Sequence, residues 1–218
     1  MYEEYFNFLN IDYQKRIALI KYASLVIDYN KNINITGAKN IEDFIKEHII
    51  DSLLAFDLFK NYDNIIDIGS GAGLPSIPLS IIYDNKKFVL CESKNKKADF
   101  LKLAKKEICL NNIEIKCVNV YEIKEKYDTI VARAFSDIKT LLKIFNKLKN
   151  KNSVLLAYKG KLNKINEELE EIKDIKKYNI LFSFDIMPAE AIVKSEIPGS
   201  INIKVYIVYK VKLISVIP

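Results

Sequence analysis

The sequence predicts an α/β protein with a doubly wound, mostly parallel sheet and a helical segment in front of it. From residue 64 onward, short apolar runs alternate with helix-length stretches, a pattern typical of a parallel sheet covered on both faces. The first 60 residues show only helical periodicity. We therefore expect a helical N-terminal cap over residues 1–60 and an α/β domain over residues 61–218, packed together as one compact unit.

The individual elements follow from periodicity and from turn residues. Apolar stripes at helical spacing predict cap helices over 13–32 and 40–59, joined by a turn-rich connector over 30–37. The expected strands are 65–68, 87–91, 113–118, 129–132, 153–158, 178–186 and 201–211, and the expected helices after residue 60 are 75–83, 94–111, 137–148 and 163–176. Because no helical pattern separates the last two strands, we expect them to form an antiparallel pair at the sheet edge.

Composition excludes several classes of protein. The chain has 218 residues, of which 50% are hydrophobic, with 6 Gly and 5 Pro, so it is neither disordered nor collagen-like. Its 3 Cys without a C-x-x-C motif argue against a disulfide framework, and its 1 His excludes a multi-histidine metal site. We expect no metal. No long uncharged apolar run or leader-like N-terminus occurs, so we expect a cytoplasmic protein without a membrane segment.

The basic side chains are concentrated toward the C-terminus. Residues 141–218 carry 14 basic and 8 acidic side chains, a difference equal to the net charge of the whole chain, +6. A basic surface of this kind fits a polyanionic partner such as a nucleic acid, although a lysine-rich composition alone also produces it.

The strongest functional motif is a glycine-rich loop between the first predicted strand and the following helix. Gly69, Gly71 and Gly73 alternate with other residues directly after Asp67 and Ile68. In doubly wound sheets this position binds nucleotide-like ligands. Glu92 ends the second predicted strand, where a carboxylate can accept hydrogen bonds from both ribose hydroxyls. Asp67 can either hold the loop or face an amine of the ligand.

Two ligand classes share this layout. A dinucleotide site requires G-x-G-x-x-G, which brings a helix N-terminus to a pyrophosphate. Here the spacing is G-x-G-x-G, and Leu74 follows the third glycine. The acidic residue before the loop and this spacing favour S-adenosylmethionine over a dinucleotide. A glycine turn without a ligand remains the third reading.

Further motifs carry a resemblance to a known family. In chain order they are Asn34-Ile35-Thr36, His48 with Asp51-Ser52, Leu74-Pro75-Ser76-Ile77-Pro78-Leu79, Lys97 with Phe100-Leu101, Arg133-Ala134-Phe135 and Lys159-Gly160. Over about residues 13–209 the chain resembles the bacterial 16S ribosomal RNA guanine-N7 methyltransferase G family, also called glucose-inhibited division protein B. The resemblance implies a class I methyltransferase fold (Rossmann-like), S-adenosylmethionine as donor, and a guanine in the 530 loop of 16S rRNA as acceptor.

The resemblance also assigns residues. Together with the motif above, it gives the expected cofactor set Asp67, Gly69, Gly71, Gly73, Leu74, Glu92, Val120, Tyr121 and Arg133. The candidates for positioning the substrate are Asn34, His48, Asp51 and Lys159. Each of these four also has an ordinary structural reading, as a turn residue, a buried histidine, its helical neighbour or an exposed lysine.

The chain departs from the family pattern at four positions. Ser76 stands where glycine is usual, and Glu92 replaces an aspartate. Glu47 stands where arginine is common, and Tyr121 where an acidic residue is typical. The last two concern contacts of the site more than the fold.

The expected reaction needs no general base. Guanine N7 has a free lone pair, so no proton has to leave before it attacks a sulfonium methyl group. We expect a monomer that acts on 16S rRNA or on the small ribosomal subunit. Two alternatives stay open: a class I methyltransferase acting on a small molecule, and a non-catalytic RNA-binding protein of the same fold.

Overall fold

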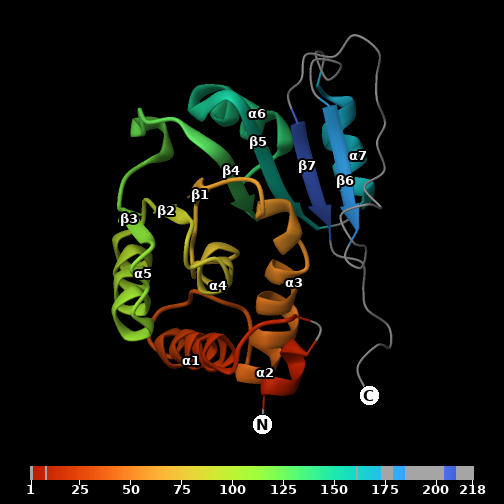
Figure 1. Ribbon diagram of the computed structural model, residues 1–218. Helices are drawn as coiled ribbons and strands as arrows, with labels where there is room; N and C mark the ends of the chain where they lie inside the picture. Colours follow the sequence, from red (N-terminus) through yellow and green to blue (C-terminus); the bar gives the residue numbers. More distant parts are fainter. Residues whose placement is uncertain (1, 8, 161, 173–178, 185–203, 210–218) are drawn as a thin grey trace.

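A computed structural model describes residues 2–7, 9–160, 162–172, 179–184 and 204–209. The strands are β1 (Asn64–Ile68), β2 (Lys87–Cys91), β3 (Ile113–Lys116), β4 (Tyr127–Arg133), β5 (Lys149–Lys159), β6 (Asn179–Phe184) and β7 (Lys204–Tyr209). They form one sheet in the order β3-β2-β1-β4-β5-β7-β6 (Figure 1). The chain adds strands on one side of β1 and then on the other, so the topological switch point lies between β1 and β4.

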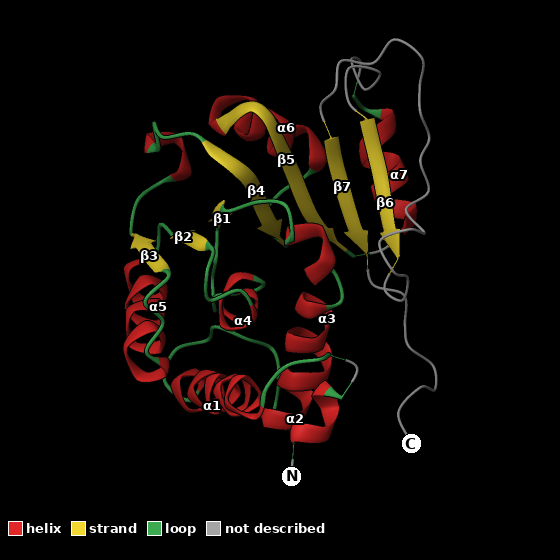
Figure 2. Ribbon diagram, viewed as in Figure 1, coloured by secondary structure: helices red, strands yellow, loops and turns green. Residues whose placement is uncertain are grey.

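Helices cover both faces of the sheet (Figure 2). They are α1 (Tyr13–Asn30), α2 (Ile41–Phe44), α3 (Ile50–Leu53), α4 (Ser76–Ile82), α5 (Asn95–Ile108), α6 (Ile138–Leu148) and α7 (Leu162–Glu170). Alternate strand residues enter two separate cores, as the two-residue period of a strand requires: Ile65 packs with the cap, α4 and α5, while Ile66 packs with α6 and α7. Strand–helix alternation in the sequence is thus confirmed as a doubly wound sheet.

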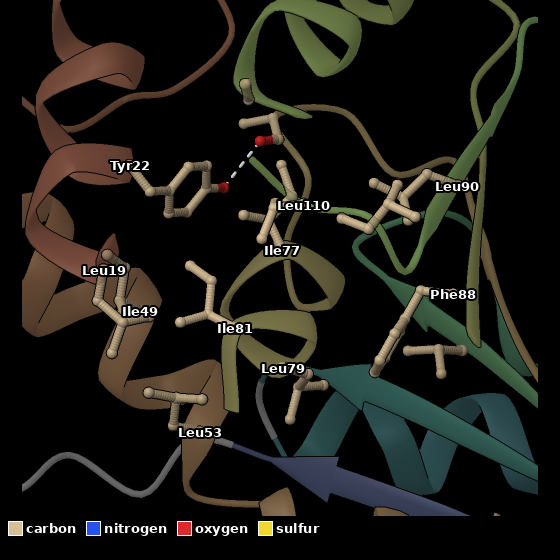
Figure 3. Close-up of a cluster of buried hydrophobic side chains, with 14 of the residues drawn as sticks. Leu19, Tyr22, Ile49, Leu53, Ile77, Leu79, Ile81, Phe88, Leu90 and Leu110 are labelled. Carbon is tan, nitrogen blue, oxygen red and sulfur yellow. Dashed lines mark hydrogen bonds between the residues drawn. The ribbon is translucent and has the colours of Figure 1, made fainter. Parts of the chain in front are cut away.

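The helical cap is also confirmed, but its second helix is not continuous. A π-helical turn, Ile45–Ile49, separates α2 from α3, and a 3₁₀ turn, Phe56–Phe59, follows. The cap shares one hydrophobic core with the sheet (Figure 3). Within it, Tyr22 of α1 donates a hydrogen bond of 2.7 Å to the carbonyl of Ala72 in the glycine loop. Burial raises the pKa of Tyr22 well above its usual value, so the hydroxyl stays a donor.

The expected antiparallel edge pair is wrong. β7 pairs in parallel with β5, and β6 pairs in parallel with β7. The expectation treated the absence of a helical pattern as a sign of a hairpin. However, β6 ends at Phe184 and β7 begins at Lys204, and a connection of that length is long enough for the crossover that a parallel pair needs.

The remaining boundaries agree with expectation to within three residues, except that β5 begins four residues earlier than expected. The last part of the expected helix 163–176, and the outer parts of the last two expected strands, lie outside the described residues.

Candidate functional site

The glycine loop leaves the carboxyl end of β1 and leads into α4. All three of its glycines have positive φ, +71° at Gly69, +58° at Gly71 and +95° at Gly73, where an L side chain is strained. The loop is tied to the neighbouring strand, since the amide of Gly69 donates to the carbonyl of Cys91 at 2.8 Å. A Cβ at Gly71 would meet only the carbonyl oxygen of Gly69, 3.8 Å away. The backbone at Gly71 therefore faces open space that a ligand can approach closely.

Glu92 fixes the loop from the end of β2. Its Oε2 accepts the amide of Gly71 at 3.0 Å, and its Oε1 accepts the amide of Lys94 at 2.9 Å. The residue is 6% exposed. Each carboxylate oxygen keeps a second lone pair, so Glu92 can bind a ligand hydroxyl while it holds the loop.

Asp67 is buried beneath the loop. The residue is 1% exposed, and neither carboxyl oxygen has a partner among the described residues. Burial raises the pKa of Asp67 to about 7, against the opposing influence of the Ser76 and Ser70 hydroxyls and of the charge on Arg133. A buried carboxyl of this kind is satisfied by a proton or by a cationic group of a ligand.

Val120 and Tyr121 lie in a short 3₁₀ turn after β3. Asn119 and Glu122 form a capping box that fixes this turn. The Val120 side chain is buried, whereas the Tyr121 ring is 58% exposed. The two residues therefore offer a buried apolar side chain and an exposed aromatic side chain beyond the end of β3.

Arg133, at the end of β4, reaches the cap. Its Nη2 lies 2.6 Å from Oδ2 of Asp51, and its Nη1 donates to the hydroxyl of Ser52 at 2.9 Å and to the carbonyl of His48 at 3.1 Å. The side chains of Arg133 and Asp51 are 16% and 12% exposed. The fork-shaped guanidinium thus joins the sheet to the cap through several atoms at once.

The turn after Arg133 contacts the glycine loop across the switch point. Ala134 has a φ of +51°, in the left-handed region that a residue with a Cβ adopts at a cost. The next residue, Phe135, places its ring against Gly69, so a Cβ at Gly69 would lie 2.2 Å from Cδ2 of that ring. The missing side chain of Gly69 therefore makes room for Phe135.

A cleft of about 830 Å³ opens on the other side of this turn. Its walls come from the ends of β4 and β5, from Asp51 of the cap and from α7. Lys159 lies in the wall, where its Nζ pairs with Glu168 at 2.7 Å and donates to the carbonyl of Ser136 at 3.0 Å. Both cations at the strand ends, Arg133 and Lys159, are therefore already paired with carboxylates.

Comparison with known proteins identifies the family. Residues 15–189 match the family described as rRNA small subunit methyltransferase G. A ribosomal RNA small subunit methyltransferase G of Brachyspira hyodysenteriae is 69% identical over 175 residues, covering 80% of this chain and 86% of the relative. The protein of that name from Borrelia garinii is 36% identical over 172 residues, covering 78% and 82%. The chain belongs to the rRNA small subunit methyltransferase G family.

A solved structure with a similar fold is an S-adenosylmethionine-dependent O-methyltransferase from Thermotoga maritima, with a TM-score of 0.49, 18% identity, and coverage of 68% of this chain and 55% of that one. The resemblance found in the sequence and the expected class I methyltransferase fold with a helical cap are both confirmed by the family match and the sheet order.

Of the four expected substrate-side residues, three take part in structural contacts. His48 and Asp51 bind Arg133, and Lys159 binds Glu168. Asn34 is exposed in the connector. There Asn30, rather than Asn34, organises the loop, because its side chain accepts the amides of Ile35 and Thr36.

The sequence-based interpretation named the main candidate residues but missed two residues that contact them. It gave no role to Phe135, although this aromatic residue stands two positions after Arg133, the last residue of β4. It also gave no role to Glu168. In the structure Glu168 is 12% exposed, pairs with Lys159 and accepts the amide of Ile138 at the start of α6.

The part of the chain that the structure describes lacks two features, a membrane-spanning helix and a metal-binding cluster. No described helix is long and apolar enough to cross a membrane. Within the same residues, no cluster of three His, Cys, Asp or Glu side chains could hold a metal ion. Cys91, Cys109 and Cys117 are all free thiols.

Proposed function

We propose that this protein transfers a methyl group from S-adenosylmethionine to N7 of one guanine in the 530 loop of 16S rRNA. Its membership of the family makes it a small-subunit rRNA methyltransferase that uses S-adenosylmethionine. The structural observation that supports the proposal most directly is the glycine loop. Glu92 holds this loop by accepting the amide of Gly71. Below the loop lies the carboxyl of Asp67, which has no hydrogen-bond partner among the described residues. The position of the guanine and the modified atom are the finer parts of the proposal.

The residues around the loop fit this donor. The open backbone at Gly71 admits the ligand, Glu92 keeps lone pairs for ribose hydroxyls, and Asp67 offers a buried carboxyl to an ammonium group. When bound, S-adenosylmethionine supplies a methyl group on a positively charged sulfur. In this proposal the residues that hold it are Asp67, Gly69, Gly71, Gly73, Leu74, Glu92, Val120 and Tyr121.

Arg133 takes a different role from the one expected for it. Its guanidinium is already bound to Asp51, Ser52 and His48, so it acts by holding the cap against the sheet beside the loop. Asp51 and His48 belong to the same connection. Lys159 is held in the cleft wall by Glu168. Asn34 is left as the exposed candidate for a contact with the substrate.

Methyl transfer itself requires orientation and the exclusion of water. The lone pair of guanine N7 forms the new N–C bond, the S–C bond breaks, and its electron pair stays on sulfur. The base becomes cationic as the sulfonium becomes a neutral thioether, and no proton has to move. Positioning of this kind is worth up to about 7–11 kcal/mol in well-aligned systems. The paired state of Arg133 and Lys159 suits the reaction, because a free cation at N7 would compete for its lone pair.

The test uses purified protein, S-adenosylmethionine labelled in its methyl group, and small ribosomal subunits from a strain that lacks guanine-N7 methylation. Protein-free 16S rRNA is assayed in parallel. We expect label at one guanine in the 530 loop, detected by mapping the modified base. Label in a small molecule from a cell extract, with none in RNA, would favour the small-molecule alternative. Cofactor binding without any transfer would favour a non-catalytic RNA-binding protein.

The proposal also covers the location, the oligomeric state and the domain organisation of the protein. We place it in the cytoplasm as a monomer, with residues 1–60 as a cap and residues 61–218 as the methyltransferase domain. The shared core of cap and sheet supports their folding as one unit. Light scattering of the purified chain tests the monomer directly.

A further inference from the structure

The cleft beside β4 and β5 contains an aromatic surface that the reaction described so far does not use. Phe135 is 38% exposed, and its ring stands between the glycine loop and the cleft. One side of the ring packs against Gly69 of the cofactor loop. Phe135 also lines the cleft, where Tyr158, the other aromatic residue among the described wall residues, is only 4% exposed. A group in contact with Phe135 in this cleft is thus next to the cofactor loop.

The backbone conformation around Phe135 fixes the position of its ring. Ala134 adopts a left-handed φ of +51° although it carries a Cβ. Arg133 before it is anchored to the cap by Asp51 and Ser52. Gly69 opposite leaves a space that the ring fills. A residue with a Cβ in the left-handed region costs free energy, and such strained residues cluster at active sites and ligand-binding sites.

The charges of the cleft indicate which part of an RNA it accepts. Among the described residues, its lining holds three cations and four carboxylates, a net charge of −1. Two of the cations, Arg133 and Lys159, are paired with Asp51 and Glu168. Such a cleft does not attract a phosphate, but it suits a neutral base that becomes cationic on methylation. A cavity of about 830 Å³ also has room for a purine ring.

The geometry of the attacked atom favours contact through the face of the base. The N7 lone pair lies in the plane of the purine, so a side chain bonded to that edge would block the attack. A ring stacked on the flat face leaves N7 free and fixes the plane in which it points. Aromatic side chains are the usual stacking surfaces for bases taken out of an RNA fold.

We propose that the cleft is the binding site for the acceptor purine and that Phe135 is its stacking surface. This inference rests on the proposed function. Phe135 thereby positions the base, while the loop, Glu92 and Asp67 hold the donor. Stacking on one aromatic ring contributes about 10-fold to 100-fold in affinity per base.

The first test measures methyl transfer to small subunits by Phe135→Leu and Phe135→Tyr. We expect Phe135→Leu to lower kcat/KM about 10-fold to 100-fold, mainly through KM for the subunit. Phe135→Tyr, which keeps the ring, retains most of the activity. The affinity for S-adenosylmethionine, measured by calorimetry, and the melting temperature stay within error of the wild type. Tyr13→Leu, which removes a 62% exposed ring at the start of α1, is the matched control and leaves all values unchanged.

The second test uses the absence of tryptophan from this chain. Phe135→Trp and Tyr13→Trp each introduce a single fluorescent reporter. With S-adenosylhomocysteine bound, 7-methylguanosine quenches the Phe135→Trp protein along a saturable curve and the Tyr13→Trp protein only by weak linear collision. Equal quenching of the two reporters overturns the inference.

Two kinetic results also overturn it. One is an unchanged kcat/KM for Phe135→Leu, and the other is a parallel loss of cofactor affinity, which would place the ring in the donor site instead. Failure of the proposed function is distinct from both, because the wild-type protein itself would then not methylate guanine.

Discussion

Two loops meet at the switch point of the sheet, and they are built in opposite ways. The loop after β1 takes its shape from missing side chains: Gly69, Gly71 and Gly73 have positive φ, and the backbone at Gly71 faces open space. The turn after β4 takes its shape from side chains that are present. Arg133 is anchored in the cap, Ala134 adopts a left-handed φ with a Cβ, and Phe135 reaches across to Gly69.

This difference in construction suits the two loops to different tasks, ligand binding for the first and positioning of the cap for the second. A loop of backbone amides and glycines allows close approach of a ligand, and a carboxylate at its side, Glu92, holds the geometry. A turn with anchored side chains instead fixes the position of one element relative to another, here the cap relative to the sheet. Changes in the first loop should therefore affect binding of the donor. In the second loop, changes at Arg133 should affect stability, and changes at Phe135 should affect the acceptor.

The largest expected effect comes from the first loop. Glu92→Ala removes the acceptor of two amides, those of Gly71 and Lys94, and leaves both without a partner. We expect the affinity for S-adenosylmethionine, measured by calorimetry, to fall about 100-fold or more. Glu114→Ala, which removes a 47% exposed carboxylate on the neighbouring β3, is the control. If the affinity of Glu92→Ala for S-adenosylmethionine stays within a few-fold of the wild type, the first loop does not have the donor-binding role described above.

The second effect concerns the turn after β4. Arg133→Ala leaves Asp51 without its partner at a site where its side chain is 12% exposed. We expect the protein to remain folded, with the free energy of unfolding lowered by about 3 kcal/mol in urea and methyl transfer strongly reduced. Arg133→Lys should recover only part of the loss, because one ammonium group cannot replace the planar fork.

Lys102→Ala provides the comparison for an exposed ion pair. Lys102 and Asp99 lie 3.0 Å apart with side chains 58% and 61% exposed. Its removal should change the free energy of unfolding by less than about 1 kcal/mol. Equal losses from Arg133→Ala and Lys102→Ala would contradict an anchoring role for Arg133.

An effect smaller than that of Arg133→Ala is a pH dependence from Asp67, beneath the first loop. Burial raises its pKa in the folded protein from 3.8 to about 7. The folded protein thus keeps a proton that the unfolded chain releases at lower pH, so its stabilising contribution is complete below about pH 4 and is lost as the pH rises to about 7. Between about pH 5 and about pH 7 the wild type should lose about 2 kcal/mol of unfolding free energy relative to Asp67→Asn. Parallel curves for the two proteins would show that Asp67 is ionised in the folded state.

The sequence predicted the first loop well and the second only in part. Glycine spacing, a preceding carboxylate and a strand-end glutamate are local signals, and each residue of the loop is close to the others in the chain. The contacts of Arg133 with Asp51 and Ser52 join residues about 80 positions apart, which no local pattern reveals. The resemblance to the family drew attention to these residues without showing that they bind one another.

Two features of the fold also escaped prediction for physical reasons. The direction of β6 and β7 depends on the path of a long connection, and strand patterns do not encode direction. The π-helical turn at Ile45–Ile49 lies within a continuous apolar stripe, and the extra residue that such a turn accommodates barely disturbs the pattern over a short helix.

The π-helical turn at Ile45–Ile49 determines how α2 and α3 are rotated relative to each other about the helix axis. Before it, Phe44 packs against Tyr22 in the core, and after it, Asp51 and Ser52 face Arg133. An α-helix advances about 100° per residue, so deleting one residue from the turn would restore regular geometry and rotate one half of the helix by that angle. The core contacts and the contacts with Arg133 could then no longer be satisfied together. The cap therefore tolerates substitutions along its surface far better than a change of length by one residue.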